Sequence, residues 1–266
     1  MELWISGLLV VGLSVAASLV ALRLVKRMPG ARDLRDTNDI AGYYIAVVGT
    51  IYAVILAFMF YAVWSRFEAA NDMVDQEANA LMDMYRLSSG LPDPLAKEMQ
   101  MALRKYAHAV IEREWPALQR REATAPLGED ADGLLDIMVH QRPDTDREKA
   151  LFDVITARFM DMSKSRRDRM LKAESTLPPL LWGMMIFGTG ITIGFSCLFG
   201  MKSYSLHALK TALLTATMTM VLFVIGALAQ PFQGGISIRP TAFCMALEQF
   251  DRLDQKWAAV ASHPGH

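Results

Sequence analysis

Hydrophobic residues are concentrated in four long stretches that contain almost no charge. They cover residues 3–22, 40–64, 179–201 and 211–238. A helix needs about 20 apolar residues to cross the hydrocarbon core of a bilayer, and each stretch can supply them. Four such runs are rare in a soluble chain. The pattern therefore predicts an integral membrane protein with four transmembrane helices.

The segment between the second and third stretches is polar overall but keeps a helical period. Apolar side chains spaced three and four residues apart form stripes at 95–110 and 151–162, as in amphipathic helices. No alternating strand pattern occurs, so the expected fold is all-helical. We expect four parts: transmembrane helices one and two (1–64), a helical extramembrane domain (65–178), a transmembrane hairpin of helices three and four (179–230), and an amphipathic helix with a tail (231–266).

The last amphipathic helix follows Pro240. It has two possible places: packed on the extramembrane domain, or on the membrane surface. Its polar face is mixed in sign rather than basic, which favours packing on the domain.

A row of mostly small and apolar residues runs along one face of the second helix. From Gly42 to Met84 its steps alternate between four and three residues, which is the spacing of a heptad seam. The seam predicts one helix that continues past the membrane to about Leu87, near 70 Å in length at ~1.5 Å per residue. The seam positions proposed to line a pore are Gly42, Ala46, Gly49, Ala53, Leu56 and Phe60.

Two interpretations of this seam remain open. Small residues permit close approach between helices, so the seam can pack against other helices of the same subunit. Alternatively, several copies of the second helix meet around a central axis. In that case Leu56 and Phe60, which continue the seam toward the membrane exit, are the best candidates for the narrowest apolar ring.

Glu77 is the only charged residue on the seam. The favoured interpretation is a buried carboxylate that pairs with an arginine or lysine from another helix of the extramembrane domain. The alternative is a titratable or ion-contacting group near the mouth of the membrane region.

A dense basic cluster lies just before the third transmembrane helix. Its members are Lys164, Arg166, Arg167, Arg169 and Lys172. Juxtamembrane clusters of this kind usually set topology or contact anionic lipid headgroups; the alternative is a basic vestibule that concentrates anions. Lys210, one turn into the fourth helix, is a further candidate for either role, although its amine can simply reach the interface.

Composition argues against several other functions. The net charge is −1, which gives no global field for binding nucleic acid. The two cysteines indicate no disulfide framework, and the five histidines have no metal-ligand spacing. A nucleophile–base pair and a glycine-rich phosphate loop are both missing. We therefore expect no metal, no cofactor and no enzymatic activity.

Several runs of sequence carry a resemblance to one bacterial family of unknown function. They include residues 38–58, 76–86, Glu114-Trp-Pro116, 177–182 and 230–234. Across nearly its whole length the chain resembles the proteins labelled bestrophin-like membrane proteins. Bestrophins are pentameric anion channels with four membrane helices and a cytosolic helical body. An acidic cluster like the bestrophin calcium clasp does not occur, so the resemblance does not imply calcium gating.

In bestrophins the second helix lines the pore, with a hydrophobic neck of residues spaced by four. Two sets of positions in this chain have that spacing. They are Leu56, Phe60 and Trp64, and Ile55, Met59 and Val63.

The first function hypothesis is therefore a homo-oligomeric ion channel, pentameric by resemblance and selective for an anion such as chloride. The second is a non-conducting membrane scaffold or sensor whose helical domain binds a partner protein. The resemblance places the chain in the bacterial inner membrane with a cytosolic helical domain, and the basic cluster agrees. The first loop argues for the opposite orientation, because short basic loops stay inside: it carries Lys26, Arg27, Arg32 and Arg35.

Overall fold

The fold is all-helical, as the sequence predicts. The computed structural model describes residues 2–28, 38–122, 129–140, 144–201 and 203–262, and every regular element among them is a helix. Four helices are long and apolar enough to cross a membrane: α1 (Glu2–Arg27), α2 (Asn38–Ser88), α7 (Pro179–Leu198) and α8 (Tyr204–Leu228). They confirm the four predicted spans. Arg32 and Arg35 lie outside the described residues.

The second helix continues well beyond a membrane span, which confirms the length predicted from the heptad seam. α2 contains 51 residues, about 76 Å at ~1.5 Å per residue. The chain divides into two compact units, and α2 contributes to both. The first unit comprises residues 1–67, 176–230 and 234–236; the second comprises 68–175, 231–233 and 237–266.

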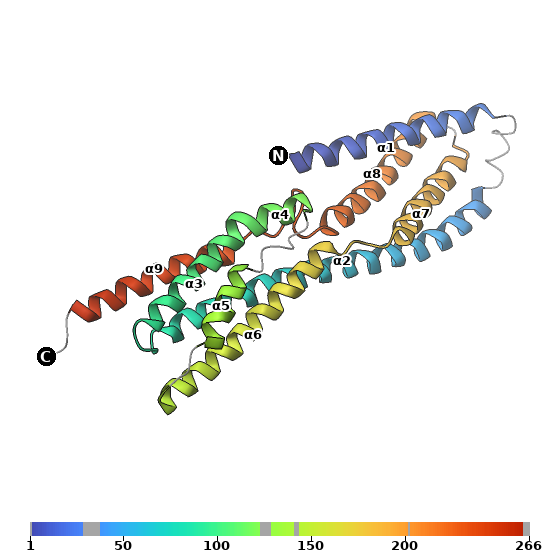
Figure 1. Ribbon diagram of the computed structural model, residues 1–266. Helices are drawn as coiled ribbons and strands as arrows, with labels where there is room; N and C mark the ends of the chain where they lie inside the picture. The colour runs from blue at the N-terminus through green and yellow to red at the C-terminus, as the bar shows by residue number, and fades with distance from the viewer. Residues whose placement is uncertain (1, 29–37, 123–128, 141–143, 202, 263–266) are drawn as a thin grey trace. The chain divides into compact units, whose positions relative to one another are not determined.

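The first unit is the membrane-spanning bundle. α1 lies along α8, and α7 packs against α8 and α1 (Figure 1). The side chain of Asn38 closes one end of this bundle: its Nδ2 donates to the Gly200 carbonyl oxygen at 2.8 Å, and Gly200 N donates to its Oδ1 at 2.9 Å. This two-way bond fixes the start of α2 against the short α7–α8 connection.

The second unit is built from the C-terminal part of α2 and shorter helices. They are α3 (Leu95–Ala109), the π-helix η2 (Val110–Glu114), α4 (Trp115–Arg120), α5 (Glu129–His140), α6 (Asp146–Glu174) and α9 (Thr241–Ser262). α6 begins with a capping box: Thr145 Oγ1 accepts from Glu148 N, and the Glu148 side chain accepts from Thr145 N. Such a cap satisfies amide groups that have no partner inside the helix.

The last helix packs on the second unit, which is the favoured one of the two predicted places. The ring of Tyr85 on α2 stacks on Phe250 of α9 at 3.8 Å between centroids. Arg104 of α3 bonds Asp251 and Asp254 at 2.6 and 2.9 Å. Burial, together with the hydrogen bond from its hydroxyl to Asp254, raises the pKa of Tyr85 to about 12. The phenol therefore stays protonated at neutral pH and keeps donating to that carboxylate.

Candidate functional site

The rotation of α2 within the membrane bundle is fixed by Tyr52. Its hydroxyl donates to the Met185 carbonyl oxygen at 2.6 Å and lies 2.6 Å from Thr189 Oγ1, both on α7. Gly188 makes room for the ring, because a Cβ at that position would overlap it. Four α2 residues enter the core at this face: Tyr52, Leu56, Met59 and Val63.

Some residues of the predicted seam are buried in this core, and others are exposed. Leu56 is only 6% exposed and packs with Met185 and Ile225 inside the bundle, so it cannot also form an apolar ring between subunits. The assignment of Leu56 to the neck stays a prediction, and its burial argues against it. Of the other seam positions, Ala46, Ala53 and Phe60 remain exposed, and Gly42 and Gly49 are half-buried. Residue spacing alone does not tell which edge of an apolar seam faces α7 and α8.

The face of α2 opposite the core is the most exposed. At ~100° per residue, positions four apart stay on one face of a helix. Val54 and Phe58 lie about half a turn from Leu56, and Phe58 is 70% exposed. Thr50 precedes them by one turn and is also exposed. From Ile40 to Ser65 the helix carries no charge, so this face is uncharged throughout and has the four-residue spacing expected of a neck.

Phe60 lies between the core and this exposed face. Its side chain is 39% exposed and stacks with Trp64 at 6.5 Å between ring centroids. Trp64 in turn stacks with Phe67 at 6.4 Å. The three rings form an aromatic ladder along α2, which limits how freely the Phe60 ring can turn.

In the second unit, Glu77 is fully buried and ion-paired with an arginine from another helix. Arg169 of α6 donates from Nε to Glu77 Oε2 at 2.7 Å and from Nη2 to Oε1 at 2.9 Å. Tyr106 of α3 donates its hydroxyl to Oε1 at 2.7 Å. This is the arrangement that the buried-pair interpretation of Glu77 required. Burial and the charge of Glu77 raise the pKa of Tyr106 well above its usual value, so the phenol remains a donor.

Glu114 also binds Arg169, and the sequence analysis did not identify it as a site residue. Its Oε2 accepts from Arg169 Nη2 at 2.7 Å, and its Oε1 accepts from Arg166 at 2.7 and 2.9 Å. The Arg169 guanidinium also lies 5.4 Å from the Trp115 ring. Two carboxylates thus face two guanidinium groups in an interior where unpaired charge would be very costly. We call these five side chains the charge cluster: Glu77, Tyr106, Glu114, Arg166 and Arg169.

A π-helical turn presents Glu114 to the cluster. The turn ends immediately before Trp115 and Pro116. Proline lacks an N–H and its ring clashes with the carbonyl four residues earlier, so a widened turn at this point has a local cause. π-turns inserted in α-helices are frequent at functional sites. Pro116, two residues after Glu114, was the available sequence signal for this turn.

The predicted basic cluster is only partly available to anions or lipid. Arg169 is fully buried and Arg166 is largely buried. Their burial argues against an anion-attracting or lipid-contacting role, which stays a prediction. They lie one turn apart on α6 and face the two acids, which come from residues distant in sequence. Lys164 and Arg167 are exposed, and Lys172 is half-buried.

Lys210 is exposed near the start of α8. Two of the hydroxyl groups that follow it donate to backbone carbonyl oxygens of α8 itself. Thr215 Oγ1 donates to the Thr211 carbonyl oxygen at 2.8 Å, and Thr217 Oγ1 to that of Leu213 at 2.9 Å. Among the described residues, no group of three or more His, Cys, Asp or Glu side chains could hold a metal ion.

Comparison with known proteins agrees with this architecture. The sequence matches the family described as Bestrophin-like domain over residues 12–243. No curated protein sequence matches the chain.

Solved structures share the fold at low sequence identity. A membrane protein superposes with a TM-score of 0.67 at 13% identity, covering 92% of this chain and 97% of that one. Two mutants of a bacterial bestrophin homologue from Klebsiella pneumoniae give TM-scores of 0.65. Their identities are 12% and 14%, with 94% and 96% of this chain and 97% and 99% of those chains covered.

Proposed function

The chain belongs to the Bestrophin-like domain family, and we propose that it assembles into a homo-oligomeric anion channel with α2 around a central axis. The number of subunits, five, and the transported ion, chloride, are proposed by resemblance to bestrophins. The observation that carries the proposal is the uncharged face of α2 that its own subunit leaves uncovered. Four helices of one chain do not enclose an aqueous pore, so conduction requires several copies.

The uncovered face supports a specific placement of the pore. A helix that packs on its own bundle through Tyr52 and Leu56 turns the opposite face toward a central axis. Thr50, Val54 and Phe58 are on that face, and Phe58 is its largest apolar side chain. The remaining exposed seam positions, such as Ala46 and Ala53, lie beside it and let neighbouring copies approach closely. An apolar constriction of this type gates ions by dewetting.

The proposed membrane is the bacterial inner membrane, with the second unit in the cytosol. Exposed Lys164 and Arg167 on α6, just before the third span, favour the cytosolic side under the positive-inside rule. The same two groups would raise the local anion concentration, which supports anion rather than cation selectivity.

Ion flux into liposomes tests the function directly. Purified protein is reconstituted and assayed separately for chloride and potassium flux. Chloride flux well above that of empty liposomes, with little potassium flux, is the expected result. Flux equal to that of empty liposomes would instead favour the scaffold or sensor, whose helical unit binds another protein.

Assembly gives the first prediction. In mild detergent, light scattering should report a protein mass several-fold above the 29.6 kDa of one chain. Gly49→Leu should lower that mass, because a Cβ at Gly49 meets nothing in its own chain and would separate neighbouring copies instead. Gly12→Leu on α1, where a Cβ also meets nothing, is the matched control and should leave the mass unchanged. A monomer at micromolar concentration would remove the channel proposal.

The exposed basic residues give the second prediction. Replacing Lys164 and Arg167 together by glutamine should lower chloride flux several-fold at low ionic strength. The loss should shrink in high salt, since charges are screened over ~3 Å at 1 M salt and ~30 Å at 0.01 M. The control is Arg147→Gln with Lys149→Gln, which removes two positive charges from the other end of α6. It should lower chloride flux less than the first pair does. Equal losses from both pairs would contradict a local role.

A further inference from the structure

Two positive side chains of α1 converge on one tyrosine of α8 at an end of the membrane bundle. Arg23 Nε donates to the Tyr204 hydroxyl at 3.0 Å. The Lys26 ammonium lies 5.3 Å from the centre of the same ring. Residues three apart are neighbours on a helix surface, so both cations come from one side of α1. Tyr204 is 38% exposed, and it therefore holds the two charges beside each other at the surface of the bundle.

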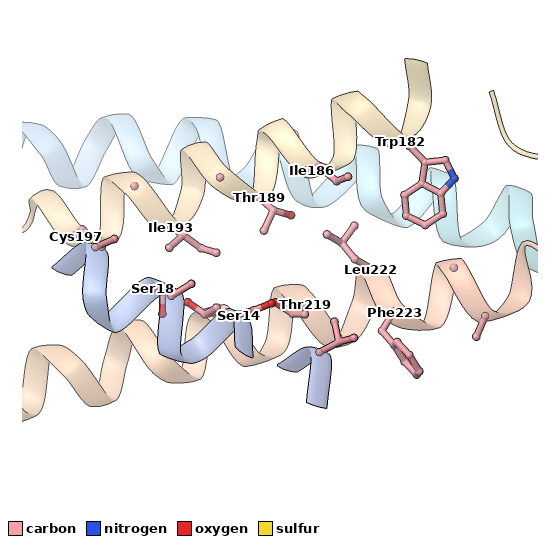
Figure 2. A pocket seen from close by; sticks show the side chains of 18 of the residues that line it. Ser14, Ser18, Trp182, Ile186, Thr189, Ile193, Cys197, Thr219, Leu222 and Phe223 are labelled. Atoms are coloured by element: carbon pink, nitrogen blue, oxygen red, sulfur yellow. The ribbon is translucent and has the colours of Figure 1, made fainter. Parts of the chain in front are cut away.

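The position of these cations along α1 matches the level of lipid headgroups. α1 carries no charge over residues 3–22, a run about 30 Å long at ~1.5 Å per residue. The hydrocarbon core of a bilayer is also ~30 Å thick. Figure 2 shows the space between α1, α7 and α8 along this span, and no charged residue of the described chain lines it. Arg23 and Lys26 are thus the first cations beyond the hydrocarbon, where lipid phosphates lie.

Neither cation has a carboxylate partner in the part of the chain that the structure describes. The described acids of the first unit are Glu2, at the opposite end of α1, and Asp39, in the first turn of α2. Neither of them forms an ion pair with Arg23 or Lys26. Like charges that are held side by side repel each other, and a bound anion would remove this repulsion.

The two cations also have donors to offer an anion. Arg23 bonds Tyr204 through Nε, which leaves both of its Nη groups without a partner among the described residues. A guanidinium group presents such N–H groups in a planar fork that fits phosphate oxygens. Lys26 adds the three donors of its ammonium group. The arrangement therefore suits a phosphate group better than a single small ion.

We propose that Arg23, Lys26 and Tyr204 bind the phosphate of an anionic phospholipid headgroup. A zwitterionic lipid brings its own positive amine, which the two cations repel, so phosphatidylglycerol should bind more tightly than phosphatidylcholine. A lipid is favoured over soluble phosphate because its acyl chains keep the headgroup at this depth. The site depends neither on ion conduction nor on which leaflet this end of the bundle faces.

Competition between two lipids tests the site. Full-length protein in mild detergent is mixed with equal amounts of phosphatidylglycerol and phosphatidylcholine, and native mass spectrometry counts the lipids that each protomer retains. The wild type should retain a several-fold excess of phosphatidylglycerol, and Lys26→Gln or Arg23→Gln should remove most of it. Lys210→Gln is the matched control, because it removes the same charge from α8, and it should keep the excess. Equal losses from Lys26→Gln and Lys210→Gln would overturn the proposal in favour of a general positive field.

Tyr204→Phe separates geometry from charge. It keeps the ring and every charge but removes the hydroxyl that bonds Arg23, so it should lower the excess of phosphatidylglycerol part of the way. Cations at helix ends also set membrane topology, and that role needs no fixed geometry. Circular dichroism selects the variants that keep wild-type helix content. An unchanged excess in folded Tyr204→Phe and Lys26→Gln would refute the site.

Inorganic phosphate distinguishes the two sources of the ligand. In phosphatidylcholine vesicles without acidic lipid, millimolar phosphate should leave the thermal unfolding of the protein unchanged, whereas added phosphatidylglycerol should raise its midpoint. The rise should be smaller in Lys26→Gln. If phosphate alone raised the midpoint as far as phosphatidylglycerol does, and Lys26→Gln abolished both effects, the site would bind a soluble anion and the lipid proposal would fail.

Discussion

Replacing Glu77 by alanine is expected to lower the free energy of unfolding by about 3–5 kcal/mol, the usual cost of breaking a buried ion pair. The change removes both acceptor atoms of the bidentate bond from Arg169 and the acceptor of the Tyr106 hydroxyl. Arg169 would keep only Glu114 as a charged partner. Its Nη1 already has no hydrogen-bond partner among the described residues, so the interior holds no spare acceptor for the released donors.

Denaturant or thermal unfolding of the detergent-solubilised protein measures this effect. Glu68→Ala removes an exposed carboxylate from the same helix and should change stability by no more than about 0.5 kcal/mol. Glu77→Gln keeps the shape but removes the charge, and should fall between the two. A negligible stability change for Glu77→Ala, with altered pH dependence of ion flux, would instead assign Glu77 a functional role.

The membrane architecture could be predicted because its cause is local. Each apolar stretch must form a helix in a bilayer, since no water is present there to bond the backbone. The long α2 was also predictable, because the heptad spacing continues through Val63 and Phe67 into the polar segment. Both conclusions depend on residues close together in the sequence.

Two features of the candidate site depend on residues that are distant in the sequence. In the sequence, Arg166 and Arg169 have the pattern of surface charges. Folding brings Glu114 and Glu77, more than 50 positions away, to bind them. The spacing of Leu56 is that of a pore residue, but the hydrogen bond from Tyr52 to α7 turns this face of α2 toward the core. In each case composition predicts the type of side chain on a face, but the partner helix decides which part of that face is buried.

Phe58→Ala is expected to raise chloride flux several-fold in liposomes, which makes it the sharpest test of where the pore lies. Phe58 is 70% exposed on the face of α2 turned away from its own core. If that face surrounds the axis, one copy of the ring from each subunit narrows the pore. Truncation would widen and wet this constriction, because apolar necks resist conduction by dewetting. Stability should change little, since the ring is not part of the core.

Phe60→Ala is the matched control, with the same substitution two residues away on α2. Phe60 is nearer the core and stacks with Trp64, so its removal should loosen that ladder with a smaller effect on flux. Leu56→Ala should cost about 2–5 kcal/mol, as for other buried leucines, because the residue packs inside the bundle. If Phe60→Ala raised flux and Phe58→Ala did not, the axis would lie along the heptad seam rather than opposite the core. If neither variant nor the wild type exceeded empty liposomes, α2 would be a packing helix of a scaffold.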